Sequence, residues 1–268
     1  MKHEMGGAQM STGTWLDTLK RQAKELRWVA RGVAQLGADV EAFPPPERAQ
    51  EDGVLAVGGD LAPVRLLAAY RRGIFPYYGP GEPILWRCPD PRYVLPLEKL
   101  RMPRDVPRLI RRNRLELRLD GDFERVVRTA AAQHASAHGT WISEEVIQAY
   151  VQLHRLGHAH CAEAWEDGEL KAGLYGVSLG RVWFGESMFT RVSNGGSVLF
   201  AVFTEQLRSW GFTLVDGQVH SAHLERFGQE PWPRARFLET LAREVAAPGY
   251  AGSWRFVPGA RGLQAAAR

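Results

Sequence analysis

Three short runs of alternating hydrophobic and polar residues follow one another closely in the second half of the chain. They cover residues 160–166, 170–178 and 181–190, and they are joined by Asp167-Gly168 and Leu179-Gly180. Alternation with a period of two is typical of half-buried strands, and such glycine-containing links are typical of tight hairpins. The pattern predicts an antiparallel meander of three strands.

Apolar residues at three- and four-residue spacing predict helices on both sides of this meander. The expected helices cover 64–72, 123–133, 143–154, 197–210, 220–227 and 234–245, and the expected further strands cover 115–119 and 212–218. A meander followed by helix, strand and helix resembles the order of Gcn5-related acyltransferases. We therefore expect an α+β fold, with a small N-terminal α/β domain and a C-terminal Gcn5-related acetyltransferase-like domain.

The N-terminal segment has a pattern of its own. Between Trp15 and Val33 apolar residues recur at helical spacing with lysines and arginines between them. This amphipathic helix either packs on the body of the protein or contacts a partner or RNA. Phe43-Pro44-Pro45-Pro46 ends it and opens a turn-rich stretch. The expected parts are an N-terminal extension at 1–42, a small N-terminal domain at 43–95, an acyltransferase-like catalytic domain at 96–255 and a tail at 256–268.

Composition narrows the class of protein. Of 268 residues, 45% are hydrophobic and 24% are charged, as in ordinary folded domains, and the net charge is only +4. Two cysteines in a chain of this length exclude a disulfide scaffold, and no apolar stretch is long enough for a membrane span. Five histidines between 134 and 160 have no carboxylate at metal-ligand spacing. We expect a cytoplasmic monomer with no metal and no membrane partner.

Three polar residues stand in apolar surroundings, where each needs a partner. Glu186 lies in the run Phe184–Phe189, and a buried glutamate must be paired or have a shifted pKa. Asp216 and Gln218 share one face of the predicted strand 212–218 with apolar residues. A structural ion pair or satisfied strand ends would explain them, but buried charge lowers stability and so usually has a function. These three are the candidate catalytic residues.

Basic and aromatic residues are candidates for RNA contact. Six arginines crowd the stretch 101–114, where Asp105 is the sole acid. The run is either a solvated charged face or a phosphate-binding surface, since arginine forms bidentate contacts with phosphate. The candidates for backbone contact are Arg101, Arg104, Arg108, Arg111 and Arg112. Tyr70, Tyr77 and Trp141 are candidates for stacking on an unpaired base, although aromatic residues more often belong to a core.

Eight short motifs give the chain a family resemblance. In order they are Gly58-Gly59-Asp60-Leu61, Tyr70-Arg71-Arg72-Gly73-Ile74-Phe75-Pro76, Ile84-Leu85-Trp86 with Pro89-Asp90-Pro91-Arg92, Gly139-Thr140-Trp141-Ile142, Gly157-His158-Ala159-His160, Leu174-Tyr175-Gly176-Val177, Gly185-Glu186-Ser187-Met188-Phe189 and Asp216-Gly217-Gln218. Over residues 43–245 the chain resembles leucyl/phenylalanyl-tRNA-protein transferases. The resemblance implies transfer of Leu or Phe from aminoacyl-tRNA to acceptor proteins with an N-terminal Arg or Lys, which marks them for degradation (the N-end rule). It implies no cofactor.

The same resemblance implies roles for single residues. Gln218 would hold the attacking amine, Asp216 would orient or polarise that contact, and Glu186 would bind amino groups nearby. The platform for the terminal adenosine of the tRNA would be formed by Tyr77 and Trp141, with Tyr70 beside them. The pocket for a side chain that is unbranched at Cβ would be formed by Leu174, Trp183, Met188, Phe203 and Val215.

Three departures from the family pattern leave pocket shape and substrate preference open. Gly195-Gly196-Ser197 stands where the family commonly has Ala-Ser-Lys, Gly217 stands where it has Cys, and Arg87 stands where it has a second Trp. Two alternative functions also stay open. A CoA-dependent N-acyltransferase would bind pyrophosphate at this glycine-rich helix start, although Arg191 is one residue too far from it. A non-catalytic module that binds RNA or N-degrons would explain the missing lysine.

Overall fold

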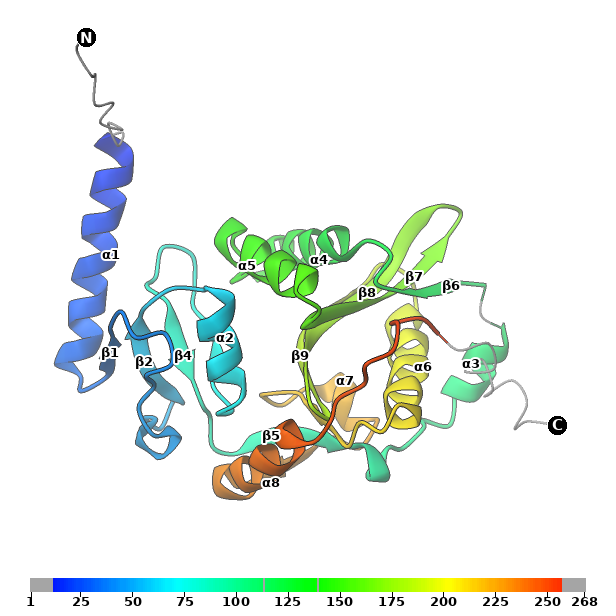
Figure 1. Cartoon of the computed structure of the whole chain (residues 1–268). Coiled ribbons are helices and arrows are strands. Elements are labelled where there is room, and N and C mark those ends of the chain that lie inside the picture. Colours follow the sequence, from blue (N-terminus) through cyan, green and yellow to red (C-terminus); the bar gives the residue numbers. More distant parts are fainter. Residues whose placement is uncertain (1–11, 113, 139, 257–268) are drawn as a thin grey trace, which may run out of the picture.

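Two β-sheets organise the residues that the computed structural model describes, which are 12–112, 114–138 and 140–256 (Figure 1). The smaller sheet lies in the N-terminal part of the chain and has the strand order β1-β2-β4-β3. Its strands are β1 (Ala34–Leu36), β2 (Val54–Gly58), β3 (Phe75–Pro76) and β4 (Leu85–Arg87). The helices of this part are α1 (Thr12–Ala30), the 3-10 turn Pro46–Arg48 and α2 (Pro63–Tyr70).

The larger sheet has seven strands in the order β11-β5-β10-β9-β8-β7-β6 and is antiparallel except between β10 and β9. Its strands are β5 (Arg92–Pro96), β6 (Glu116–Leu119), β7 (Ala159–Glu166), β8 (Glu169–Leu179), β9 (Val182–Thr190), β10 (Leu214–Asp216) and β11 (Glu230–Trp232). Its helices are the 3-10 turn Leu97–Lys99, α3 (Val106–Arg112), α4 (Phe123–His138), α5 (Glu144–Arg155), α6 (Gly195–Ser209), α7 (Ala222–Glu225) and α8 (Arg234–Ala246). Helices α4 and α5 cover one face of the central strands and α6 covers the other (Figure 1).

Strands β8 and β9 are buried on both faces. Tyr175 and Phe184 belong to the apolar cluster beneath α4 and α5, whereas Leu174 and Trp183 belong to the cluster beneath α6. This division follows from the strand period of two, which sends neighbouring side chains to opposite faces. The first cluster continues into the smaller sheet and includes Tyr70 of α2. The two sheets therefore share a continuous core at their junction.

Helix α5 begins where its sequence predicts. The Ser143 hydroxyl accepts the backbone N–H of Val146 at 3.3 Å, and two glutamates occupy the first turn. A serine cap and acidic residues both stabilise the start of a helix. The buried face of α5 then carries Tyr150 toward the junction of the two sheets.

The predicted α+β class and the predicted meander are confirmed. Strands β7, β8 and β9 pair antiparallel through tight turns in which Asp167, Gly168 and Gly180 have positive φ. The predicted strand 212–218 is too long, because β10 ends at Asp216 and Gln218 leaves it with a φ of +63°. Strands β5 and β11 were not predicted, because each contains a proline and a proline in a sequence usually indicates a turn.

The sheets divide the chain differently from the predicted boundaries. Strand β1 lies within the predicted extension 1–42, yet it pairs with β2 in the smaller sheet. The predicted boundary between 95 and 96 falls inside β5, which pairs with β10 and β11. These long-range pairings leave no local signal, and a division near residue 90 fits both sheets. Residues 1–11 of the extension and 257–268 of the predicted tail lie outside the described residues.

Helix α1 stands at the side of the smaller sheet and is held there by polar contacts (Figure 1). Lys24 Nζ donates to the Gly81 carbonyl at 2.8 Å and to Glu82 Oε1 at 2.6 Å. The side chains of Leu19 and Leu26 remain 41% and 64% exposed. The amphipathic spacing therefore predicts the helix but not how it packs. Within the described ranges no helix combines the length and the apolar character that a bilayer span requires.

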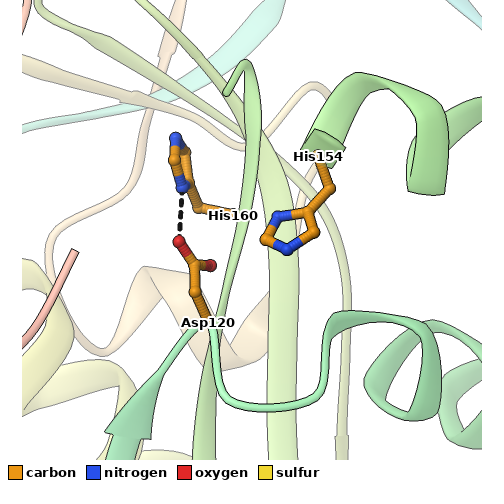
Figure 2. Close-up of side chains that lie close together, drawn as sticks. All are labelled: Asp120, His154 and His160. Carbon is orange, nitrogen blue, oxygen red and sulfur yellow. Dashed lines mark hydrogen bonds and ion pairs between the residues drawn. The ribbon is translucent and has the colours of Figure 1, made fainter. Parts of the chain in front are cut away.

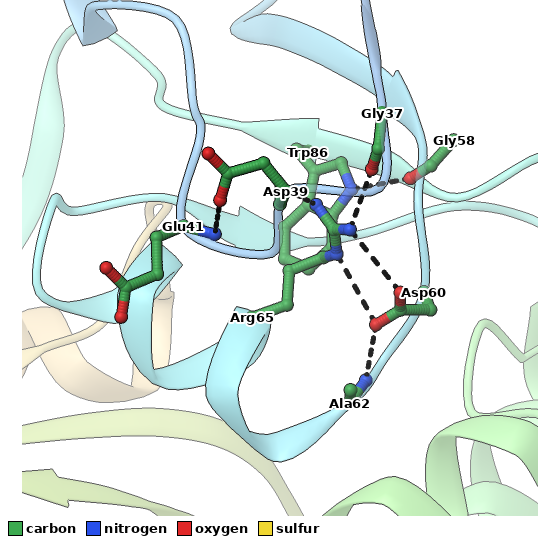
Figure 3. A network of polar contacts seen from close by, with 8 residues as sticks. All are labelled: Gly37, Asp39, Glu41, Gly58, Asp60, Ala62, Arg65 and Trp86. Carbon is green, nitrogen blue, oxygen red and sulfur yellow. Dashed lines mark hydrogen bonds and ion pairs between the residues drawn. The ribbon is translucent and has the colours of Figure 1, made fainter.

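The Gly58-Gly59-Asp60-Leu61 motif folds around a buried arginine (Figure 3). Arg65 is 1% exposed; its Nη2 donates to the Gly37 carbonyl at 2.9 Å, and its Nε lies 3.4 Å from Asp60 Oδ1. A Cβ atom on Gly59 would lie 3.2 Å from the Arg65 guanidinium, and φ there is +73°, so glycine is required. This motif therefore stabilises the smaller sheet.

Candidate active site

A β-bulge in β9 aims Glu186 at the junction of the two sheets. Tyr175 of β8 pairs with Ser187, but Gly176 pairs with Gly185, so Glu186 is the extra residue. A bulge sets two residues opposite one and changes the direction of its side chains. As a result Glu186 and Ser187 reach α5 and α4, respectively, instead of pointing to opposite faces.

Three neutral donors converge on the Glu186 carboxyl group. The Tyr70 hydroxyl donates to Oε1 at 2.7 Å, the Gln218 carboxamide donates to the same oxygen at 2.9 Å, and the Tyr150 hydroxyl donates to Oε2 at 2.8 Å. The two tyrosine hydroxyls also form a hydrogen bond with each other. Each hydroxyl has a single proton, so two protons cannot serve all three oxygen contacts. When Glu186 is protonated, its proton supplies the third contact, and one of the tyrosine hydroxyls then accepts from the carboxyl group instead of donating to it.

The pKa of Glu186 agrees with this proton count. Burial raises it to about 7, although the hydrogen bonds from Tyr70 and Tyr150 act to lower it. Burial and the Glu186 charge raise the pKa values of both tyrosines well above their usual value. The tyrosines thus stay protonated while Glu186 exchanges its proton near neutral pH. A carboxyl group that titrates there is suited to general base catalysis.

Gln218 occupies a strained turn that fixes its side chain. Its φ is +63°, and the Val219 N–H donates to the Gly217 carbonyl across it at 2.6 Å. Residues with a Cβ rarely adopt such a conformation, which persists only where the surroundings enforce it. Because the carboxamide nitrogen donates to Glu186, the carboxamide oxygen is left as an acceptor. That oxygen has no protein partner in the described part of the chain.

Asp216 lies behind this turn, fully buried. Arg92 Nε donates to Asp216 Oδ1 at 2.8 Å, and Arg92 Nη2 donates to Oδ2 at 2.6 Å. The same Oδ1 accepts the backbone N–H of Gln218 at 2.9 Å. Strand pairing explains the contact, because β10 runs beside β5 and sets Asp216 opposite Val94. With no exposed surface, Asp216 cannot contact a bound substrate directly and meets the cavity side of the site only through Gln218.

An apolar cavity of about 240 Å³ opens beside Glu186. Four of the five residues predicted for the pocket line it, namely Leu174, Trp183, Met188 and Val215. The fifth, Phe203, lies behind Trp183 and meets its ring edge-on, with 4.9 Å between the centroids. Seven further lining residues were not predicted for the pocket, namely Tyr175, Gly185, Ser187, Phe200, Gly217, Ser221 and Leu224.

Tyr77 and Trp141 form an accessible aromatic pair. Their ring centroids are 5.5 Å apart with the planes tilted by 45°, and Tyr77 is 46% exposed. The guanidinium of Arg87 lies 5.7 Å from the Tyr77 ring centroid. Tyr70, expected beside this pair, is fully buried because α2 turns it inward to Glu186. It has no free ring face for a base.

The predicted RNA-contact arginines lie on α3 and on the segment before it. All five are exposed, and within the described ranges none of them forms an ion pair. The neighbouring acid Asp105 is paired instead with Arg226, at 3.1 Å. Pro107 is tolerated because it falls in the first turn of α3. The positive charge of this surface is therefore not neutralised from within.

Two family models match the chain one after the other. The model of the leucyl/phenylalanyl-tRNA protein transferase N-terminal domain matches residues 59–90, and the model of the leucyl/phenylalanyl-tRNA protein transferase matches residues 94–242. A leucyl/phenylalanyl-tRNA–protein transferase from Myxococcus xanthus is 53% identical over 216 residues, which cover 80% of this chain and 92% of the relative. The chain belongs to the leucyl/phenylalanyl-tRNA-protein transferase family.

Other similar proteins extend the comparison. The leucyl/phenylalanyl-tRNA–protein transferase of Aeromonas hydrophila is 45% identical over 229 residues, covering 85% of this chain and 97% of the relative. Among solved structures, a GCN5-related N-acetyltransferase from Kribbella flavida is 14% identical with a TM-score of 0.33, covering 63% of this chain and 60% of that one.

Two departures from the pattern of leucyl/phenylalanyl-tRNA-protein transferases are matched by neighbouring residues. A Cβ atom on Gly217 would lie 2.4 Å from Gln229 Nε2, and one on Gly195 would lie 2.7 Å from Val192 Cγ2. Contacts under 3.0 Å cannot persist without movement of a neighbour. In this member of the family, other side chains thus occupy the space beside both glycines.

The amides at the start of α6 are already engaged. The Gly195 N–H donates to the Val192 carbonyl at 3.2 Å, and the Gly196 N–H donates to Thr190 Oγ1 at 3.3 Å. A phosphate site at a helix start requires unsatisfied N–H groups. This arrangement does not favour the binding of CoA pyrophosphate.

Asp120, His154 and His160 form the cluster in the described part of the chain that could hold a metal (Figure 2). One ligand atom of each lies within 4.8 Å of the others. Sequence spacing misses the cluster because the three residues come from different elements. However, His160 Nδ1 already contacts Asp120 Oδ2 at 2.7 Å, and His154 Nδ1 contacts the Ala159 carbonyl at 2.8 Å. These bonds brace α5 and the loop after β6 against β7.

Three residues of this candidate site have roles that the sequence does not indicate. The sequence marks Tyr150 only as an aromatic residue that could stack on a base, yet it is fully buried and donates to Glu186, and it marks Arg92 only as part of a motif. His134 is one of the five histidines without a carboxylate at metal-ligand spacing, and its Nε2 is hydrogen-bonded to the hydroxyl of Ser187 at 2.9 Å beside the cavity. Each contact joins elements far apart in the chain.

Proposed function

We propose that this chain transfers Leu or Phe from aminoacyl-tRNA to the N-terminal Arg or Lys of acceptor proteins, which marks those proteins for degradation under the N-end rule. The observation that carries the proposal is an apolar cavity beside the hydrogen-bonded pair of Gln218 and Glu186. The cavity takes the side chain of the transferred amino acid, and the pair takes the amine that attacks its ester. The names of the relatives support the same reaction.

The attacking amine must first lose a proton, because an N-terminal amino group is largely protonated at neutral pH. Glu186, with a pKa of about 7, accepts that proton, and the Gln218 carboxamide oxygen accepts a hydrogen bond from the amine. The nitrogen then bonds to the ester carbonyl carbon, the bond to the ribose oxygen breaks, and that oxygen leaves with a proton. One proton is released per transfer. Since the ester is already activated, positioning supplies much of the rate.

The tRNA is held by two kinds of contact. The terminal adenosine stacks on Tyr77 and Trp141, which fixes where the aminoacyl group falls. The arginines on and before α3 bind phosphates without reading sequence. The enzyme acts as a monomer in the cytoplasm and uses no cofactor.

A filter assay with radiolabelled leucyl-tRNA and a protein that begins with Arg tests the proposal. Label is expected on this acceptor and not on a matched acceptor that begins with Asp. Binding of leucyl-tRNA without any transfer would instead identify a non-catalytic RNA- or N-degron-binding module. Binding of acetyl-CoA in a calorimeter would favour the CoA-dependent N-acyltransferase.

A further inference from the structure

Arg92 is a buried arginine whose one polar partner among the described residues is Asp216. Its side chain and that of Asp216 are both fully inaccessible, and two of its nitrogens bind the two carboxylate oxygens. The third, Nη1, has no hydrogen-bond partner in the described part of the chain. The ring centroids of Phe75 and Phe237 each lie 4.7 Å from its Cζ atom. The guanidinium is therefore confined by two aromatic rings and aimed at Asp216.

The orientation of Asp216 decides the shape of the Gln218 turn. Asp216 Oδ1 receives both Arg92 Nε and the Gln218 backbone N–H, so the carboxylate links the two. A residue at a φ of +63° needs such outside support to remain in place. The conformation of this turn also determines where the Gln218 carboxamide meets Glu186.

We propose that Arg92 is a positioning residue for aminoacyl transfer: by clamping Asp216 it holds the Gln218 turn, and with it the acceptor oxygen for the attacking amine. This inference rests on the proposed function. Arginine is required because its planar guanidinium forms a bidentate contact that fixes the plane of the carboxylate. A lysine keeps the positive charge but presents a single point of contact, so it leaves the carboxylate free to rotate.

Arg65 provides a matched control, because it is also almost fully buried and its planar guanidinium also forms several hydrogen bonds. Within the described part of the chain its hydrogen bonds go to the carbonyls of Gly37 and Asp39 and to the Asp60 carboxylate beside the smaller sheet (Figure 3), and none of these residues belongs to the cavity or to the Glu186 network. Arg65→Lys therefore reports what the loss of a buried guanidinium does to the fold alone.

The test compares Arg92→Lys with Arg65→Lys in three measurements: melting temperature, affinity for leucyl-adenosine, and the single-turnover rate of Leu transfer to an Arg-ended protein. Arg92→Lys should slow the single-turnover step by about 100-fold, the usual effect of misplacing a reacting group by an ångström. Its affinity for leucyl-adenosine should stay close to wild type. Arg65→Lys should lower the melting temperature while leaving the transfer rate unchanged.

Two results would overturn the inference. One is a wild-type transfer rate in Arg92→Lys, and the other is an equal loss of rate in Arg65→Lys. If Arg92→Lys does not fold, Phe237→Leu replaces it, because it loosens the guanidinium without altering a charge, and an unchanged rate in that variant is equally decisive. Failure of the wild-type chain to transfer Leu would count against the proposed function instead.

Discussion

Gln229 fills the space that a side chain at Gly217 would need, with its Nε2 only 2.4 Å from the position of the missing Cβ. The Gln229 carboxamide is held in place, because it donates to the Val219 carbonyl at 3.0 Å and accepts the Ser221 N–H at 2.8 Å. Glycine at 217 and glutamine at 229 thus belong together. Both border the turn that carries Gln218.

Gly217→Cys should therefore destabilise this chain, even though cysteine is the residue that the family pattern leads one to expect. Forcing a side chain into filled space costs about 1 to 3 kcal/mol. In urea titrations Gly217→Cys should cost less stability in a Gln229→Ala background than in the wild-type chain, although Leu224 Cδ1 remains 2.9 Å from the same position. An equal cost of Gly217→Cys in the two backgrounds would show that the two positions are independent.

Leu transfer should accelerate between pH 6 and pH 8, because Glu186 titrates with a pKa of about 7 and must be ionised to accept a proton. Glu186→Gln should slow single-turnover transfer by about 100- to 10,000-fold, the range of general base catalysis. In the variant the rise should move to higher pH, because it then follows only the deprotonation of the attacking amine, whose pKa is about 8. A rise that stays centred near pH 7 in Glu186→Gln would belong to another group.

Stability should change with pH in the opposite direction. The folded state raises the pKa of Glu186 from 4.5 to about 7, so it binds this proton more tightly than the unfolded chain does. The stabilisation is complete below pH 4.5 and is lost as pH rises through 7. Glu186→Gln, which mimics the protonated group, should be the more stable form at pH 8 by about 1 to 3 kcal/mol. Equal stability of the two proteins at pH 8 would contradict the raised pKa.

Trp141 and Trp183 should have separable effects on substrate use. Trp141→Ala should weaken Leu and Phe esters of adenosine alike, because Trp141 belongs to the exposed pair assigned to the adenosine. Trp183→Ala should change the Leu/Phe ratio, because Trp183 lines the cavity. Competition against leucyl-tRNA measures both effects, and the reverse pattern would exchange the two roles.

Replacing Arg104, Arg108 and Arg111 with Ala should weaken tRNA binding and flatten its dependence on salt, since fewer counterions are released. A titration of affinity against salt concentration gives the slope. The control removes the same charge from exposed arginines that are already paired with glutamates, at Arg118, Arg128 and Arg208. Equal slopes in the two triple variants would leave the α3 arginines as a solvated surface.

The meander could be predicted because its information is local. The runs of β7, β8 and β9 are long enough to show alternation, and their turns carry their own glycine signals. The bulge that aims Glu186 is different, because it exists only in the register between two strands. The sequence thus indicates a buried glutamate without indicating which groups meet it.

The turn at Gln218 could not be predicted for a similar reason. A regular strand through 218 is the default for this pattern, and the departure depends on Asp216 being held by Arg92, 124 positions earlier in the chain. Such a pair is visible only once β5 and β10 lie side by side. Arg92 falls in one family motif and Asp216 and Gln218 fall in another, and only the fold shows that Arg92 binds Asp216, which in turn accepts the Gln218 backbone N–H.

Tyr70 comes from the smaller domain and Glu186 from the larger one, yet they share a hydrogen bond at the centre of the site. The site therefore depends on both domains and cannot be transferred with the larger domain alone. A fragment that starts near residue 90 would retain the cavity and Tyr150, but its glutamate would have lost the Tyr70 donor and the apolar cover that comes with it, and Arg92 would have lost the ring of Phe75. Exchanging the smaller domains between relatives would accordingly change the pKa of the Glu186 carboxyl group.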